Sequence, residues 1–590
     1  MKKLRTGASA AGLLLCAAPS LAAAAGNSAQ AEERSVTIPA QLSESQREAY
    51  RAIFADLRAE NWAGATARLD GMSEGPLHHV ARAMLYTLPG SPRVELGPLL
   101  ELLDRAPELP HSSDLARLAV ARGATSLPNM PEVQRLAGLA GQPRRARPRS
   151  VQGDPVADAL EPLIQPLLVA DQPFQAENLF NEQGFGLSPE ARTAFQQRIA
   201  WVYFLNGNDR EALRMANQAR AGVTEWAVHG EWVAGLAAWR LDDCRAAAEH
   251  FDNVATRSTD IELTAAGHYW AARADTACGH PERVQARLRN AARLTETFYG
   301  LIAQSALGMR QRSADLEAFT AADWRAWADL RNVRAAVALA EIGENGLASD
   351  LLRHQARIGS SRDHEPLLHL AGRLNFTGTQ MWLAHNGPRG ARTETHDRYP
   401  APSWRPQRGW RVDQALVFAH ALQESNFRPD AVSGAGARGL MQVRPGTAGD
   451  LVRWGRTSGD TGRLNEPVTN IEFGQTYLEY LRDLPSTGGL LPKVIASYNA
   501  GPAPIEQWNS RFDQSDPLLF IESIPYWETR GYVPIVLRNY WIYEQQSADR
   551  SSSRRALAQG LWPRFPGLSG ATAVRIPPRR AQTASAAADD

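Results

Sequence analysis

Apolar residues recur at helical spacing through the first half of the chain. Between Ser43 and Gly308, apolar positions such as Leu115, Leu118 and Ala119 fall three or four residues apart, and short breaks containing Gly, Pro or Asp separate these stretches. This spacing places the apolar side chains on one face of a helix. The pattern predicts a predominantly all-α protein.

Three of these stretches share an internal order. Residues 202–219, 239–254 and 269–292 each begin with an aromatic-rich helix, pass through a polar break with Gly or Asp, and continue into a second helix rich in Ala and Leu. This order is typical of tetratricopeptide-type helix pairs. Because one pair cannot bury its apolar face alone, we expect the pairs to stack into an α-superhelical repeat domain over residues 26–320.

The rest of the chain predicts three further regions. A helical stretch indicates a helical linker domain over residues 321–400, and a joint rich in Pro, Gly and Arg at residues 387–408 marks its boundary. A compact C-terminal domain is expected over residues 401–562. Residues 563–590 are rich in Ala, Arg, Ser and Pro, which predicts a disordered tail.

The first 25 residues have the features of a secretory signal peptide. Basic residues at the start precede an apolar stretch at residues 8–18, and small residues lead up to Ala25. This stretch is too short to cross a membrane as a helix, so we expect cleavage near Ala25 and export to the periplasm. Leu15 precedes Cys16 where a lipoprotein signal has a small residue, so we do not expect a lipid anchor.

The composition supports folded domains and provides no overall charge for binding an anionic polymer. Apolar residues make up 44% of the chain, and 64 basic residues against 63 acidic ones leave a net charge of +1. We therefore expect no nucleic-acid partner. The Arg-rich loop at residues 144–149 is a local exception that could bind an anionic polymer, although we favour a solvated loop or linker.

Two cysteines remain after the predicted cleavage, Cys244 and Cys278. They are 34 residues apart, about the length of one helix-pair repeat, which would place them at similar points of adjacent repeats. In an oxidising compartment they could form a disulfide. Two buried thiols on neighbouring helices are the alternative, and the sequence leaves both open.

Two motifs that suggest a metal or a nucleotide do not fit their context. His364 and His369 are five residues apart with Pro366 between them, so they would not share one face of a helix. The glycines of residues 434–439 match G-x-G-x-x-G, but a helical pattern rather than a strand precedes them. We therefore expect no metal and no cofactor.

One glutamate of the C-terminal domain lies in a setting that suits acid catalysis. Helical spacing from Val412 onward ends near Glu424, ahead of Pro429. The negative end of the helix dipole and apolar neighbours such as Phe427 favour the protonated carboxyl that a general acid needs. On these grounds alone, a solvated glutamate at a helix end is the simpler interpretation.

Four short motifs alter that interpretation. They are E-S at 424–425, G-L-M-Q at 439–442, Y-N-A-G at 498–501 and E-T-x-x-Y-V at 528–533. In this order and approximate spacing they resemble the lysozyme-like catalytic domain of the soluble lytic transglycosylases, relatives of goose-type lysozyme. The resemblance covers about residues 404–544, and the aromatic elements near residues 269–300 more loosely resemble the superhelix of that family.

The resemblance implies roles for individual residues. It makes Glu424 the single catalytic acid/base. It places further residues in or beside the sugar-binding groove: Ser425, Ser433, Met441, Gln442, Tyr498, Asn499, Glu528 and Tyr532. Tyr498 would hydrogen-bond Glu424 or the substrate, and the last motif, with Glu528 and Tyr532, is where the family places contacts to the groove and to the catalytic Glu. Core packing for Met441 and a purely structural role for Tyr532 stay open.

One position departs from the family pattern. Arg444 stands where the family commonly has Met. If its side chain lines the groove, it could contact a peptide carboxylate or alter substrate preference. If it points outward, it changes nothing.

The function implied by the resemblance is that of an exported peptidoglycan lytic transglycosylase. Glu424 would protonate the β-1,4 glycosidic oxygen between N-acetylmuramic acid and N-acetylglucosamine, and would then deprotonate the C6 hydroxyl that closes a 1,6-anhydro ring. We expect a monomer that acts on peptidoglycan glycan strands, with a superhelix that could bind other cell-wall enzymes. A hydrolytic muramidase and a non-catalytic glycan-binding scaffold remain as alternatives.

Overall fold

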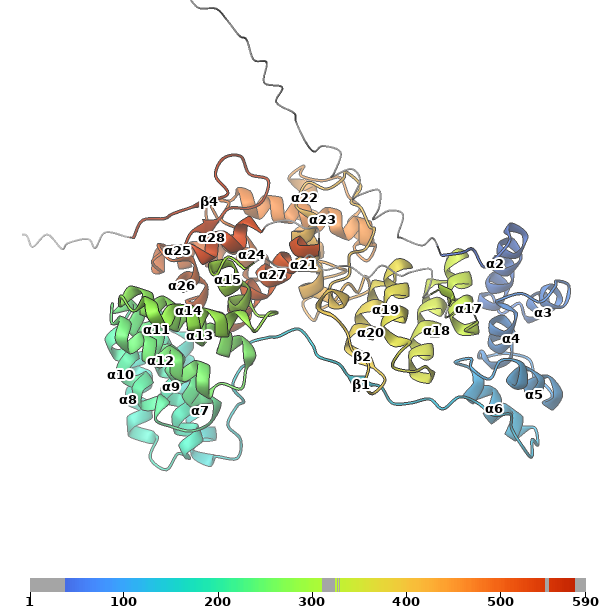
Figure 1. Ribbon diagram of the computed structural model, residues 1–590, viewed down its shortest axis with the longest axis horizontal. Coiled ribbons are helices and arrows are strands. Elements are labelled where there is room, and N and C mark those ends of the chain that lie inside the picture. The colour runs from blue at the N-terminus through green and yellow to red at the C-terminus, as the bar shows by residue number, and fades with distance from the viewer. Residues whose placement is uncertain (1–37, 310–323, 326, 328, 547–550, 579–590) are drawn as a thin grey trace, which may run out of the picture. The chain divides into compact units, whose positions relative to one another are not determined.

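The computed structural model describes residues 38–309, 324–325, 327, 329–546 and 551–578 (Figure 1). The predicted signal peptide and Cys16 lie outside these residues. The described residues are mostly α-helical, and their four strands have two residues each, which confirms the all-α prediction. None of the described helices is long and apolar enough to cross a membrane.

The chain folds into two compact units, and the first combines two separate segments, Met1–Leu136 and Glu317–Leu374. Ionic contacts join the segments, since Arg47 donates to Glu341 Oε2 at 3.1 Å. The predicted boundaries at residues 320 and 400 therefore do not coincide with this unit. Its helices are α2 (Glu44–Arg58), α3 (Trp62–Asp70), α4 (His78–Thr87), α5 (Leu96–Arg105), α6 (Ser112–Ala121), α17 (Arg331–Glu341), α18 (Asn345–Ile358) and α19 (His364–Arg373).

The second unit contains Ala137–Leu316 and Asn375–Asp590, and begins with the helix pairs that the sequence predicts. Each helix packs on its neighbours in chain order, as α11 does on α10 and α12. Close approach requires small residues, since a Cβ on Gly267 would lie 2.7 Å from the Ala255 nitrogen. The helices are α7 (Pro155–Val169), α8 (Pro173–Gln183), α9 (Pro189–Leu205), α10 (Asp209–Arg220), α11 (Thr224–Arg240), α12 (Cys244–Arg257), α13 (Ile261–Ala277), α14 (Pro281–Ala292) and α15 (Phe298–Ala306).

The two cysteines of this region form a disulfide. Cys244 is the first residue of α12 and Cys278 is the C-cap of α13, and their Cα atoms lie 5.5 Å apart. The bond therefore joins adjacent helix pairs at equivalent points. Of the two arrangements that the sequence left open, the structure has the disulfide.

The C-terminal part of the same unit surrounds one long helix. This helix, α27 (Trp527–Gln546), packs along α21 (Gln414–Ser425) and α24 (Leu491–Ala500). The other elements are α20 (Thr377–His385), η1 (Thr395–Arg398), α22 (Pro445–Arg453), η2 (Thr461–Arg463), α23 (Pro467–Asp483), α25 (Pro502–Arg511), α26 (Pro517–Glu522), α28 (Ser552–Ala558), and the antiparallel strand pairs β1 (Ala137–Gly138) with β2 (Asn386–Gly387) and β3 (Trp562–Pro563) with β4 (Ala573–Val574).

The segment that follows β3 corrects the prediction of a disordered tail. Phe565 is almost fully buried and donates its backbone N–H to the Gly489 carbonyl at 2.8 Å, and β4 then pairs with β3. Burial of Trp562 and Phe565 supplies the apolar anchors that the flanking Ala, Ser and Pro residues lack. Residues 579–590 lie outside the described part.

The Arg-rich loop is solvated in part: Arg144, Arg147 and Arg149 are exposed, as we expected, but Arg145 packs within the second unit. Arg145 donates two hydrogen bonds to Glu522, at 2.6 and 3.0 Å, and Tyr299 donates a third at 2.7 Å. Glu522 lies at the end of α26 with 1% of its side chain exposed. The loop thus fixes α26 to α15 of the superhelical region.

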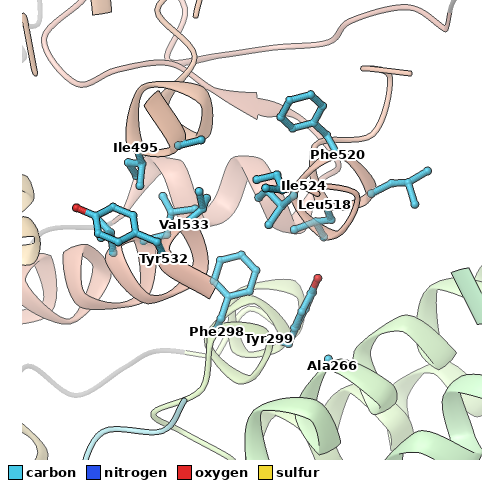
Figure 2. Packing of buried hydrophobic residues seen from close by; sticks show 14 of the residues in the cluster. Ala266, Phe298, Tyr299, Ile495, Leu518, Phe520, Ile524, Tyr532 and Val533 are labelled. Carbon is cyan, nitrogen blue, oxygen red and sulfur yellow. The ribbon is translucent and has the colours of Figure 1, made fainter. Parts of the chain in front are cut away.

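Apolar packing surrounds this charge cluster. Figure 2 shows Phe298 and Tyr299 between Ala266 of the superhelical region and Leu518 and Ile524 of the C-terminal part. Phe298 also stacks on Trp541 of α27, with 5.2 Å between ring centroids. The superhelical helices and the C-terminal helices of this unit therefore share one hydrophobic core.

Replacing Arg145 by Met tests the cluster. The variant leaves the buried Glu522 carboxylate without its cation, so we expect the unfolding free energy of this unit to fall by about 3–5 kcal/mol. Urea denaturation followed by circular dichroism measures the change. Arg149→Met, which alters an exposed side chain of the same loop, is the control, and equal midpoints for the two variants would contradict this role.

Candidate active site

The carboxyl group of Glu424 lies near the C-terminal end of α21. Asn426 and Phe427 adopt left-handed conformations (φ 50° and 57°) that end the helix directly after the E-S motif. Tyr532, on α27, donates its hydroxyl proton to Glu424 Oε1 at 2.6 Å. The packing of α21 on α27 thus supplies the acid with a hydrogen-bond donor.

The surroundings of Glu424 favour its protonated form. Burial raises the pKa of Glu424 to about 7, the hydroxyl of Tyr532 opposes that rise, and the negative charge of Glu528 adds to it. A pKa near neutrality leaves comparable amounts of acid and carboxylate, which suits a group that must first give and then accept a proton.

The first turn of α27 forms a second polar cluster with the Y-N-A-G motif. Asn499 donates its side-chain N–H to Glu528 Oε1 at 3.2 Å and accepts from Thr529 Oγ1 at 2.6 Å. Glu528 is exposed. The structure thus connects Asn499 and Glu528 directly, on the helix that carries Tyr532.

Tyr498 and Met441 support the acid from inside the domain. Tyr498 donates its hydroxyl to the Met441 carbonyl at 2.8 Å, so its protein partner is this carbonyl and not Glu424. Met441 is fully buried, and a Cβ on Gly474 would lie 2.1 Å from its sulfur. Of the two interpretations of Met441, the structure has core packing.

Ser425 has its hydroxyl inside the fold. The side chain is buried, and its hydroxyl donates a hydrogen bond to the Leu440 carbonyl at 2.7 Å. The same hydroxyl accepts a hydrogen bond from the Arg428 N–H at 3.2 Å. The motif serine therefore fixes the helix end to the following loop and does not line a groove.

Ser433 and Gln442 shape that loop. The Ser433 hydroxyl accepts from the Ala437 N–H at 3.0 Å. Gln442 has a positive φ of 48°, and its side-chain N–H group donates to the carbonyls of Ala431 and Gly439 at 3.1 and 3.0 Å. Both side chains retain exposed surface beside the acid-bearing helix end.

Asn470 of α23 is a residue that the sequence analysis missed. It is fully buried, accepts from the Met441 N–H at 2.7 Å, and donates to the carbonyls of Arg438 and Leu464 at 2.8 and 2.7 Å. Gly439 allows this approach, since a Cβ there would lie 2.3 Å from the amide nitrogen. An asparagine within a largely apolar helical stretch was the only signal in the sequence.

His420 lies one turn before Glu424, between two tyrosines of the site. Its ring centroid is 4.8 Å from that of Tyr498 and 6.2 Å from that of Tyr532. Burial lowers the pKa of His420 to about 4, so the ring is neutral at physiological pH. It adds no positive charge that would favour the carboxylate form of Glu424.

Two other carboxylates of this domain, Glu472 and Glu466, each form ion pairs with arginines. Glu472 is buried and accepts hydrogen bonds from Arg408 and Arg411, which lower its pKa against the effect of burial. Glu466 forms an ion pair with Arg463.

The sequence of this region matches a known domain family. Residues 404–521 match the family model described as "Transglycosylase SLT domain". Over 155 residues the chain is 36% identical to a soluble lytic murein transglycosylase from Escherichia coli. The aligned residues make up 26% of this chain and 24% of that protein. The corresponding protein from Salmonella typhimurium is 40% identical over 133 residues, 22% of this chain and 20% of the relative.

These matches show that the C-terminal region is related to the soluble lytic transglycosylases, as the four motifs indicated. The chain spans about a quarter or less of the length of these two relatives. The match therefore covers the region around Glu424 and leaves the first unit and the superhelical region to structural comparison.

Two solved structures are similar over most of the chain. The 70-kDa soluble lytic transglycosylase of Escherichia coli has a TM-score of 0.51 at 18% identity, over 88% of this chain and all but 1% of that one. An inactive mutant of lytic transglycosylase Slt from Pseudomonas aeruginosa has a TM-score of 0.50 at 20% identity, over 90% of this chain and 77% of that one. This similarity shows that the chain has the same fold, a helical superhelix followed by a lysozyme-like domain.

Replacing Asn470 by Ala tests its role in the loop. The substitution removes one acceptor and two donated hydrogen bonds, so we expect the unfolding free energy to fall by about 2–4 kcal/mol. Denaturant titration measures the loss. Asn465→Ala, an exposed position two residues before α23, is the control, and a loss no larger than that of the control would show that the loop does not depend on Asn470.

Proposed function

We propose that the protein is an exported peptidoglycan lytic transglycosylase that cleaves the β-1,4 bond between N-acetylmuramic acid and N-acetylglucosamine. The observation that carries the proposal is the buried carboxyl of Glu424, with a pKa of about 7 and Tyr532 as its donor, inside a segment that matches the transglycosylase domain model.

The first step is general acid catalysis. Protonated Glu424 gives its proton to the glycosidic oxygen, and the bond from that oxygen to C1 of the muramic residue breaks. The N-acetyl group of the same residue stabilises the positive charge that develops at C1. The remaining carboxylate keeps the hydrogen bond from Tyr532, which holds it in place for the next step.

The second step returns the proton to the enzyme. Glu424, now a carboxylate, takes the proton of the C6 hydroxyl, and O6 bonds to C1 to close the 1,6-anhydro ring. Since the nucleophile belongs to the sugar itself, proximity favours it over water. One carboxyl group suffices for both steps, in contrast to the two carboxylates of most glycosidases.

Further parts of the proposal concern place and partners. We assign the protein to the periplasm, with residues 1–25 as a cleaved signal peptide and no lipid anchor. The relatives from Escherichia coli and Salmonella typhimurium are named soluble lytic murein transglycosylases. We assign Gln442, Asn499 and Glu528 to contacts with the glycan, because these side chains retain exposed surface near the acid. The protein acts as a monomer, and its superhelical region is available to other cell-wall enzymes.

Mass analysis of peptidoglycan digests tests the reaction. The mature protein should release muropeptides one water lighter than hydrolytic products, and Glu424→Gln should release none. Hydrolytic products would instead identify a muramidase. Intact glycan binding by both proteins without any products would identify a scaffold.

The pH profile tests the assignment of the acid. Because the pKa of Glu424 is about 7, the acid form is lost and the cleavage rate should fall as pH rises through that value. Tyr532→Phe removes the donor that opposes the effect of burial, so this alkaline limb should move to higher pH, with a lower maximal rate. Exposed Tyr526→Phe is the control, and a limb that stays in place or moves to lower pH would contradict the assignment.

A further inference from the structure

A row of aromatic rings leads from the surface of the C-terminal domain to the candidate site. Trp454 lies against Tyr480 with 5.0 Å between ring centroids, Tyr480 stacks on Tyr477 at 6.1 Å, and Tyr477 lies 5.3 Å from Tyr498. Tyr498 in turn contacts the ring of His420, one turn from Glu424. The row thus connects an exposed surface with the residues that support the acid.

The outer part of this row is accessible. Trp454 is 50% exposed, whereas Tyr480 and Tyr477 are partly buried and the guanidinium of Arg456 lies over the Tyr480 ring, 5.2 Å from its centroid. Exposed aromatic faces provide flat apolar surfaces with polar edges, and such surfaces suit the C–H faces of sugar rings.

Helix α22 carries a cation at the end opposite Trp454. Arg444 is its N-cap and Trp454 its C-cap, so the two residues lie about 15 Å apart along the helix. Arg444 directly follows Met441, Gln442 and Val443, the segment whose carbonyl binds Tyr498.

Arg444 differs from the arginines around it. Arg453 pairs with Asp450, and Arg456 pairs with Asp483. Arg444 is exposed and has no carboxylate partner among the described residues. Its charge is therefore available to a ligand.

Tyr477 provides a hydroxyl beside that charge. This hydroxyl has no hydrogen-bond partner among the residues that the structure describes. The Tyr477 ring lies 5.3 Å from that of Tyr498, whose hydroxyl binds the carbonyl of Met441, three residues before Arg444. Burial raises the pKa of Tyr477 to about 12, so its hydroxyl is protonated at physiological pH. The neutral phenol can donate a hydrogen bond, so cation and phenol together suit an anionic oxygen.

We propose that Trp454, Tyr480, Tyr477 and Arg444 form a binding surface for an acidic glycan strand, in which the exposed ring of Trp454 stacks on a sugar, Tyr480 and Tyr477 support that ring, and Arg444 binds a carboxylate. This inference rests on the proposed function, which supplies a strand with carboxylates of two kinds. They are the lactyl carboxylate of a peptide-free muramic residue and the carboxylates of a stem peptide. Arg444 thereby selects strands with muramic residues over neutral chitin-type oligosaccharides.

Binding and kinetics of Arg444→Met test the selection. With intact peptidoglycan strands, we expect KM to rise about tenfold or more while kcat stays nearly unchanged, since a charge-assisted hydrogen bond is lost outside the reacting bond. In a Glu424→Gln background, affinity for intact strands should fall equally, and affinity for neutral chitin oligosaccharides should stay the same. Arg453→Met, which alters a paired arginine of the same helix, should change neither.

Two further experiments distinguish the two sources of the carboxylate and test the contribution of the aromatic rings. Amidase treatment frees the lactyl carboxylate, which an amide bond masks in every muramic residue that carries a peptide. A loss of affinity on Arg444→Met that is larger for amidase-treated strands than for intact strands identifies the lactyl carboxylate as the ligand, and a loss confined to intact strands identifies the stem peptide. Trp454→Ala should weaken acidic strands and neutral oligosaccharides alike, severalfold.

The outcomes distinguish this inference from the function on which it rests. Equal losses of affinity for chitin oligosaccharides and for peptidoglycan on Arg444→Met, or no loss for either, would overturn the selection even in an active enzyme. A wild-type protein that binds strands through Arg444 without cleaving them would overturn the transglycosylase and retain the binding surface.

Discussion

The contact between Glu424 and Tyr532 is the interaction on which the candidate site depends. The two residues are 108 positions apart, and only the packing of α21 on α27 brings the hydroxyl within 2.6 Å of the carboxyl. That packing also removes the carboxyl from water, which raises its pKa to about 7. A fully solvated glutamate would be ionised at neutral pH and could not act as an acid.

A second set of interactions holds the loop that follows the acid. Tyr498 binds the Met441 carbonyl, Asn470 binds the Met441 N–H, and Ser425 binds the Leu440 carbonyl. All of these bonds lie in the interior, where an unsatisfied backbone group would be costly. Some motif residues therefore take part in the proposed reaction, and others hydrogen-bond the backbone groups of the neighbouring loop.

The Arg145–Glu522 pair joins distant segments of the second unit. It joins residues 377 positions apart, and Tyr299 adds a hydrogen bond to the same carboxylate. Paired charges of this kind add little stability compared with apolar side chains of similar size, but they specify one arrangement because a misplaced partner leaves a buried charge. The C-terminal helices are thus fixed on the superhelical region by geometry as well as by apolar packing.

The sequence by itself determined the all-α fold, the helix pairs, the position of Glu424 near a helix end and the relation of its surroundings to a known domain, because periodicity and short motifs depend on neighbours in the chain. It could not determine that Tyr532 rather than Tyr498 holds the acid, that Asn470 holds the loop, or that Arg145 pairs with the buried Glu522. It also missed the two-segment first unit and the folded residues 564–578. Each of these depends on contacts between distant segments, and tertiary packing alone decides which polar groups lose their water and which partner replaces it.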